Sequence, residues 1–176
     1  MTARRSAALL AATALAAALT ACAPASAPTP SPTPTGFASE EEAFAAAEAT
    51  YRAYVDALNQ VDLSDPATFE PVYALLEGEA ADAARRSFSQ MHADGWRVEG
   101  DSRPTLVQTA EYANEQVSLA VCVDVSDVRV LDANGESVVN DRPEVQSLTV
   151  LADSDPRKST KAVITKFSAR SDGPAC

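Results

Sequence analysis

The chain is poor in the side chains that most often carry chemistry, with one histidine, one tryptophan and three cysteines in 176 residues. The single histidine, His92, cannot build a zinc site without partner ligands. No glycine-flanked nucleophile elbow accompanies Ser87 or Ser89. A histidine-based zinc enzyme and a serine hydrolase are therefore disfavoured, and we expect neither a metal nor a cofactor.

Basic residues are also scarce. Lysine and arginine total 14 against 25 acidic residues, the net charge is −11, and no lysine precedes Lys158. Such acidity argues against nucleic-acid binding through a basic patch and against electrostatic docking on anionic lipid. The alanine-rich and proline-rich composition agrees with a high-GC, actinobacterial source.

Long apolar runs are missing apart from residues 7–19, which follow Arg4 and Arg5. A membrane-spanning helix needs roughly 20 apolar residues, whereas a charged start, a short apolar stretch and small residues describe an export signal. The run ends in Leu19-Thr20-Ala21-Cys22, which resembles the lipobox of bacterial lipoprotein precursors.

This resemblance implies that Cys22 is acylated and becomes the first residue of the mature chain. The protein would then be held on the extracytoplasmic face of the cell membrane by lipid, and two or three acyl chains anchor durably. The alternative is an ordinary secretory signal cleaved near Ala21 or Ala23.

The segment after Cys22 contains five prolines between Ala23 and Gly36 and no large apolar side chain. Such a tract predicts an extended linker, which reaches about 40 Å at roughly 3.1 Å per residue. We therefore divide the chain into a signal peptide (1–21), the lipidated cysteine with its linker (22–36) and one domain (37–176). Removal of residues 1–21 takes the net charge to about −13.

Two cysteines remain if Cys22 carries lipid. Cys122 and Cys176 form an even pair in an oxidising compartment, which predicts a disulfide. The bond would tie the C-terminus to a central strand.

Helical periodicity dominates the first half of the domain. Ser39 and Glu42 match a capping box, and the helix they open should run to about Asn59. A short helix should follow Asp65-Pro66, and a third should span 79–93 and end at Gly95.

Alternation replaces helical periodicity after Gly95. Candidate strands cover 96–99, 106–112, 116–125 with a continuation at 128–131, 145–151 and 162–168. The slip at Ser126-Asp127 suggests a bulge or bend within one long strand, and Asn134-Gly135 is typical of a hairpin tip.

Helices followed by antiparallel strands indicate an α+β fold, with N-terminal helices packed on a curved antiparallel sheet of about four to five strands. The element order, with Trp96 after Gly95, resembles the nuclear transport factor two-like superfamily of cone-shaped domains. A cystatin-like or other α+β sandwich remains an alternative. Many members of the superfamily pair through their sheets, so a homodimer is left open.

This resemblance implies a cone that binds small apolar molecules, and in some members isomerises or dehydrates them with an Asp or His base. The candidate pocket residues are Tyr51, Tyr54, Trp96 and Tyr112. The candidate bases are Asp56 and Asp124, which would need burial and a raised pKa. For Trp96 we favour a structural role, closing the open end of the core.

Three functions compete. We favour a non-catalytic binding or interaction module of the cell envelope with a protein or envelope partner, because the catalytic inventory is poor. A carrier or sensor of a small apolar ligand comes second, and an isomerase or dehydratase of the ketosteroid isomerase type comes third. An open apolar cone without a paired acid would remove the third.

Overall fold

The computed structural model describes residues 36–176. The signal peptide, Cys22 and nearly all of the linker lie outside the described residues. The helices are α1 (Glu40–Leu58), the 3-10 turn η1 (Pro66–Phe69), α2 (Glu70–Tyr73) and α3 (Gly78–Ala93). The strands are β1 (Arg97–Glu99), β2 (Arg103–Ala113), β3 (Gln116–Asp124), β4 (Arg129–Leu131), β5 (Val145–Ser154) and β6 (Ala162–Ala169).

Helix α1 begins where its capping residues predicted. The Ser39 hydroxyl accepts from the backbone amide of Glu42 at 3.2 Å. The Glu42 carboxylate accepts in turn from the amide of Ala38, and it pairs with the ammonium of Lys161. The helix therefore starts with its free amides satisfied, and its buried stripe runs along Ala43, Ala46, Ala47, Thr50, Tyr51 and Val55.

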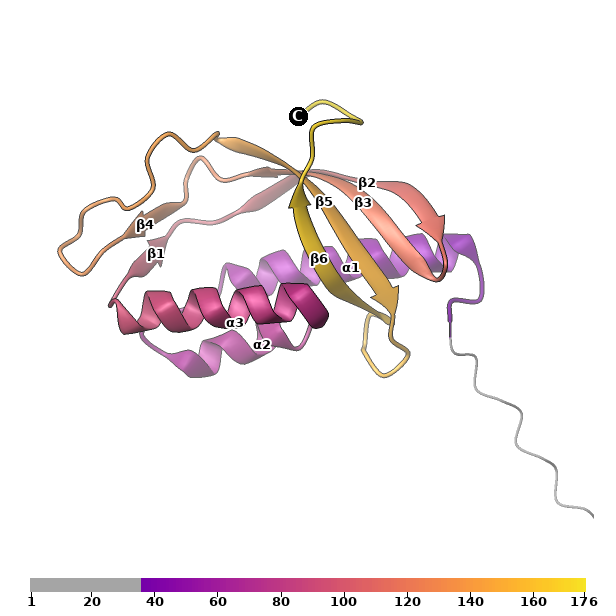
Figure 1. Ribbon diagram of the computed structural model, residues 1–176, viewed down its shortest axis with the longest axis horizontal. Coiled ribbons are helices and arrows are strands. Elements are labelled where there is room, and N and C mark those ends of the chain that lie inside the picture. The colour runs from indigo at the N-terminus through magenta and orange to yellow at the C-terminus, as the bar shows by residue number, and fades with distance from the viewer. Residues whose placement is uncertain (1–35) are drawn as a thin grey trace, which may run out of the picture. The chain divides into compact units, whose positions relative to one another are not determined.

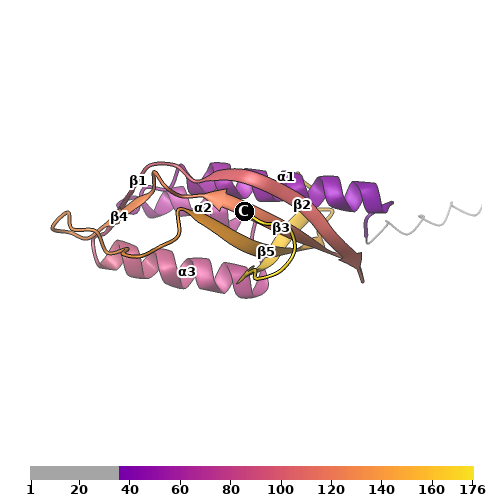
Figure 2. The ribbon, with the colours of Figure 1, turned by 90° about the horizontal axis from the view of Figure 1, so that it is seen from above.

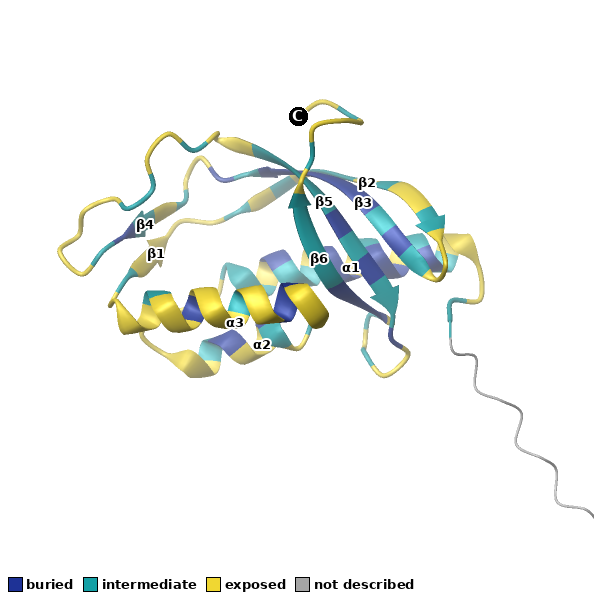
Figure 3. Cartoon of the chain, viewed as in Figure 1, coloured by how far each residue is buried: buried dark blue, intermediate teal, exposed yellow. Residues whose placement is uncertain are grey.

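The main sheet has four antiparallel strands in the order β2-β3-β5-β6. Strand β3 carries the clearest alternation, because Val117, Leu119 and Val121 are fully buried on one face. The helices cover this face, whereas the C-terminal tail lies on the opposite side of the sheet (Figures 1 and 2). Figure 3 shows buried residues in dark blue along β3 and β5 of this sheet. The α+β class and the helices-on-sheet arrangement are confirmed.

The second sheet differs from what the sequence pattern indicated. Residues 116–131 are not one bent strand, because the Asp124 carboxylate accepts from the amide of Ser126 at 2.9 Å and turns the chain out of the main sheet. The amide of Val128 then bonds to the carbonyl of Val125. Strand β4 consequently pairs with β1 in a separate two-stranded sheet, at the left of Figure 1.

The expected single helix after Asp65 is a 3-10 turn followed by one turn of α-helix. The Asp65 side chain caps it by accepting from the amide of Ala67 at 3.0 Å. Beyond α2 the backbone runs against β6, since Ile164 exchanges hydrogen bonds with Leu75 and Glu77. This contact covers the edge that β6 would otherwise expose.

The predicted disulfide between Cys122 and Cys176 is present, with the two Cα atoms 5.6 Å apart. Cys122 lies on β3 and faces away from the helices, because side chains alternate along a strand. The Arg170 guanidinium donates to the carbonyls of Asp172 and Pro174 and lies beside the Cys176 sulfur. The tail is therefore fixed to the outer face of the sheet.

Candidate binding cavity

A hollow of about 370 Å³ lies between the helices and the inner face of the main sheet. We call it the cone cavity. Helices α1 and α3 run along its two sides, and β3, β5 and β6 supply the remaining wall. Its lining residues are Tyr51, Tyr54, Val55, Leu58, Leu76, Ala80, Ala83, Ala84, Ser87, Phe88, Ser102, Val123, Val125, Gln146, Leu148 and Phe167.

Aromatic rings form much of the wall. The ring of Tyr54 lies 5.0 Å from that of Phe167 and 6.3 Å from that of Tyr51, measured between centroids. Tyr51 is 1% exposed and Phe88 is 7% exposed. Ala83 and Ser87 are exposed although they line the cavity, so the cavity opens to solvent along α3.

The two tyrosines keep their protons far above neutral pH. Burial raises the pKa of Tyr54 to about 12. Burial, together with the neighbouring Tyr54, also raises the pKa of Tyr51 well above its ordinary value. Both hydroxyls are therefore neutral groups that can donate a hydrogen bond into an apolar space.

The cone cavity is lined by no charged side chain. Asp56 is exposed on α1 and lines a different surface hollow with Gln60 and Thr68. Asp124 is half-buried on the outer side of β3, and its hydrogen bonds from Ser126 lower its pKa. The structure brings neither candidate base to the cavity, and a lowered pKa is the opposite of what a general base at neutral pH needs.

Tyr51 and Tyr54 are the two candidate pocket residues that line the cone cavity. Tyr112 packs its ring edge-on against Phe37 and Phe44, with centroids 6.2 and 6.3 Å away. Trp96 packs partly buried against the core at the junction of α3 and β1, and its amide bonds to the carbonyl of Met91. Trp96 and Tyr112 are therefore packing residues here.

His92 also has a structural position. Its Nδ1 lies 2.6 Å from the carbonyl oxygen of Leu63, and its ring packs edge-on against Phe69. Because a carbonyl oxygen only accepts, Nδ1 must carry the proton. The histidine ties the end of α3 to the turn before η1.

Sequence reasoning missed several lining residues. Phe167, Leu148 and Gln146 reach the cavity from β5 and β6. Alternation in 145–151 places Gln146 on the same face as Leu148 and Val150, so a polar residue on an apolar face was the available signal. Ser102 lies between predicted elements and gave no such signal.

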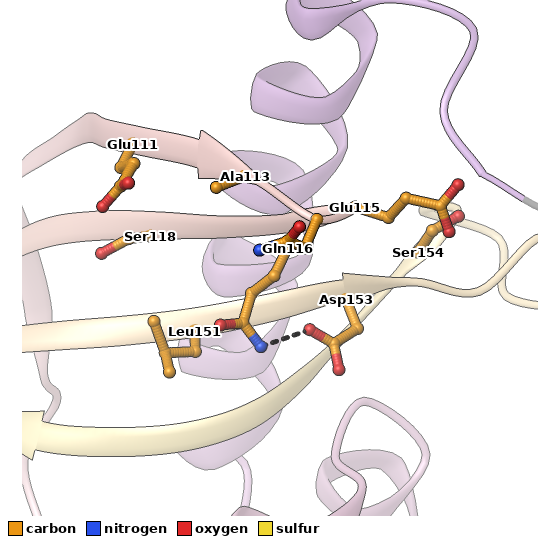
Figure 4. Close-up of a pocket in the computed structure, with 9 residues that line it drawn as sticks. Glu111, Ala113, Glu115, Gln116, Ser118, Leu151, Asp153 and Ser154 are labelled. Atoms are coloured by element: carbon orange, nitrogen blue, oxygen red, sulfur yellow. Dashed lines mark hydrogen bonds between the residues drawn. The ribbon is translucent and has the colours of Figure 1, made fainter.

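A larger hollow, about 550 Å³, lies on the outer face of the sheet at the β2–β3 hairpin. The Gln116 amide donates to the Asp153 carboxylate at 2.7 Å. Figure 4 shows that the carboxylates of Glu111, Glu115 and Asp153 do not converge on one point. Within residues 36–176, no group of three or more His, Cys, Asp or Glu side chains is placed to hold a metal ion. This surface hollow is less suited than the cone cavity to a defined ligand.

Among the described helices, none is both long enough and apolar enough to cross a membrane.

No family model matches the chain, and no curated protein matches it. Several solved structures are similar in fold. CagV, a VirB8 homolog of the T4SS from Helicobacter pylori strain 26695, aligns over 70% of this chain and 95% of its own, at 10% identity and a TM-score of 0.46. A proposed aromatic ring hydroxylase from Novosphingobium aromaticivorans aligns over 75% of this chain and 96% of its own, at 12% identity and a TM-score of 0.47.

A periplasmic fragment of TraM aligns over 77% of this chain and all of its own length, at 14% identity and a TM-score of 0.41. At these identities and TM-scores, the similarities do not indicate a shared function with any of the three proteins.

Proposed function

We propose that this chain is a membrane-anchored, non-catalytic binding module of the cell envelope, and that its ligand is a small, uncharged, largely apolar molecule held in the cone cavity. The observation that carries the proposal is the cavity of about 370 Å³ with aromatic walls and no charged lining residue. Its volume falls within the range of small-molecule sites, about 300 to 1,000 Å³. An open apolar cone favours the carrier or sensor function over a protein partner.

The chemistry of the lining specifies the ligand class. A charged ligand would lose its hydration without gaining a counter-charge, which is costly in an apolar site. The neutral hydroxyls of Tyr51 and Tyr54 offer hydrogen bonds to an acceptor such as a ketone, ester or ether oxygen. The isomerase alternative lacks a base, since neither Asp56 nor Asp124 lines the cavity.

The fold agrees with this function. We propose that the domain belongs to the nuclear transport factor two-like superfamily, because three helices precede the main antiparallel sheet and enclose the cavity against its inner face. Membership would imply a cone that binds small apolar molecules.

Native mass spectrometry of the protein purified from its own host tests the function. We expect a reproducible small-molecule adduct that Ala84→Trp removes, because Ala84 lines the cavity and the larger side chain occupies it. Ala93→Trp is the matched control, since Ala93 is exposed at the end of the same helix. An adduct that survives Ala84→Trp would contradict binding in the cone.

The anchor is tested separately. We propose that Cys22 carries the lipid, as the residues before it suggest. Cys22→Ser should move the protein from the membrane fraction to the fraction released by osmotic shock or into the medium. Unchanged membrane association of the variant would contradict lipid anchoring.

A further inference from the structure

A second apolar hollow, about 190 Å³, lies beside the cone cavity. We call it the side cavity. It is enclosed by the end of α1, by Met91 on α3, and by Val98 and Val130 of the β1–β4 sheet. Because β1 and β4 form a two-stranded sheet separate from the main sheet, they provide a wall that the main sheet does not.

The two cavities share part of their lining. Leu58, Phe88 and Ser102 line both of them, so the two hollows adjoin at these three residues. Leu58 and Phe88 are apolar, and a chain passing between them would remain in hydrocarbon surroundings. Neither hollow is lined by a charged side chain.

Where the two cavities adjoin, the backbone polar groups of Ser102 are hydrogen-bonded. The side-chain amide of Asn59 donates to the carbonyl of Ser102 at 2.9 Å, and its oxygen accepts from the amide of Ser102 at 2.9 Å. The backbone groups of Ser102 are thus satisfied, so they do not present an unpaired polar group to a passing hydrocarbon.

Hydrogen-bonding groups are distributed unevenly along this path. The cone cavity has the hydroxyls of Tyr51, Tyr54 and Ser87 and the amide of Gln146. In the side cavity, beyond the shared Ser102, the one polar lining side chain is Asn59, whose amide is already paired. A ligand with one polar end would therefore place that end in the cone.

We propose that the cone and side cavities form one elongated site for a single uncharged hydrocarbon chain, with its polar end in the cone and its apolar end beneath the β1–β4 sheet. This inference rests on the proposed function. Benzene, with six carbons, occupies an apolar cavity of about 150 Å³. At that density the cone holds roughly fifteen carbons and the side cavity roughly seven more.

Binding of primary alcohols of about six to twenty carbons tests the length of the site. Each alcohol displaces the neutral fluorophore N-phenyl-1-naphthylamine from the full chain carrying Cys22→Ser, which avoids detergent. Affinity should rise about fourfold per methylene, and the rise should continue past the length that fills the cone alone.

Two variants shorten the site from different sides. Val130→Trp places an indole in the side cavity from β4, and Met91→Phe narrows the cavity from α3. Both should end the rise at roughly fifteen carbons and leave the affinity for the shortest alcohols within about twofold of the wild type. Val145→Trp makes the same replacement at a residue that is 37% exposed on β5, and it should match the wild type.

The outcomes separate the two proposals. A wild-type series that stops rising at the length of the cone, or a series that Val130→Trp and Met91→Phe leave unchanged, would overturn the elongated site while keeping the ligand-binding function. Failure of the wild type to bind the fluorophore or any alcohol would overturn the proposed function itself. The wild-type series decides the question even where a variant does not fold.

Discussion

Asn59 and Ser102 are joined by two hydrogen bonds of 2.9 Å, one in each direction between the Asn59 side chain and the Ser102 backbone. Asn59 closes α1, and Ser102 directly precedes β2. The pair lies where the cone cavity and the side cavity adjoin, since Ser102 lines both and Asn59 lines the side cavity. The same contact therefore supports the end of α1 and the place where the two cavities adjoin.

Replacement of Asn59 by alanine should destabilise the protein. The change leaves the partly buried amide and carbonyl of Ser102 without partners, which costs roughly 1 to 3 kcal/mol. Urea unfolding followed by circular dichroism measures the loss. Asn134→Ala is the control at an exposed hairpin tip, where a change within about 0.5 kcal/mol is expected. Equal losses in the two variants would contradict the assigned role of Asn59.

Loss of the disulfide should have a larger effect. Cys122 and Cys176 are 54 residues apart, and closing a loop of that size stabilises a fold by roughly 4 kcal/mol in the chain-entropy model. The double variant Cys122→Ala, Cys176→Ala should show this decrease in the free energy of unfolding. Dithiothreitol should lower the stability of the wild type by a similar amount and leave the variant unchanged. A wild type insensitive to the reductant would mean that the bond does not form in the purified protein.

Tyr54 should make stability fall in alkali. Its pKa is raised to about 12 in the folded protein by burial, whereas an unfolded tyrosine ionises near 10. Because the pKa is higher in the folded protein, the stability that the neutral Tyr54 side chain contributes is fully present below about pH 10. This stability is lost as the pH rises from about 10 to about 12. Tyr54→Phe should remove up to roughly 3 kcal/mol of this alkaline loss.

The absorbance of phenolate at 295 nm provides the direct check on Tyr54. The difference between the wild-type and Tyr54→Phe titrations should appear near pH 12 while the protein is folded. A difference that appears near pH 10 would show that the Tyr54 hydroxyl is solvated, and the cone would then be wetter than its lining suggests.

Local sequence signals predicted much of the fold. Ser39 and Glu42 located the start of α1, the alternating valines of 116–125 located β3, and Asn134-Gly135 located a turn. Each of these signals depends on residues a few positions apart, and the physical cause acts over the same range. The disulfide could also be predicted, because counting the cysteines requires no knowledge of which residues lie close together.

The departure of β4 from the main sheet was not predicted. The pattern slip at Ser126-Asp127 was visible, but a bulge and a turn look alike in a periodic pattern. The choice depends on the hydrogen bond from Ser126 to Asp124 and on the pairing of Val98 with Val130. Pairing between distant segments is decided by tertiary packing, which one sequence does not display.

The candidate site was predicted in part. Tyr51 and Tyr54 reach the cone cavity, whereas Trp96 and Tyr112 pack elsewhere. All four are aromatic residues near apolar stretches, so their residue type could not separate them. A cavity arises where side chains from several elements fail to fill the space between them, and that shortfall is a property of three-dimensional packing.

Titration of the Cys22→Ser protein with N-phenyl-1-naphthylamine decides whether the cone cavity binds a ligand, because the probe is neutral, apolar and fluorescent when it leaves water. We expect saturable binding to one site, weakened about tenfold or more by Ala84→Trp and unaffected by Ala93→Trp. Ala84 lines the cone cavity and Ala93 is exposed on the same helix. Binding that Ala84→Trp leaves intact, or no saturable binding in the wild type, would contradict a ligand site in the cone.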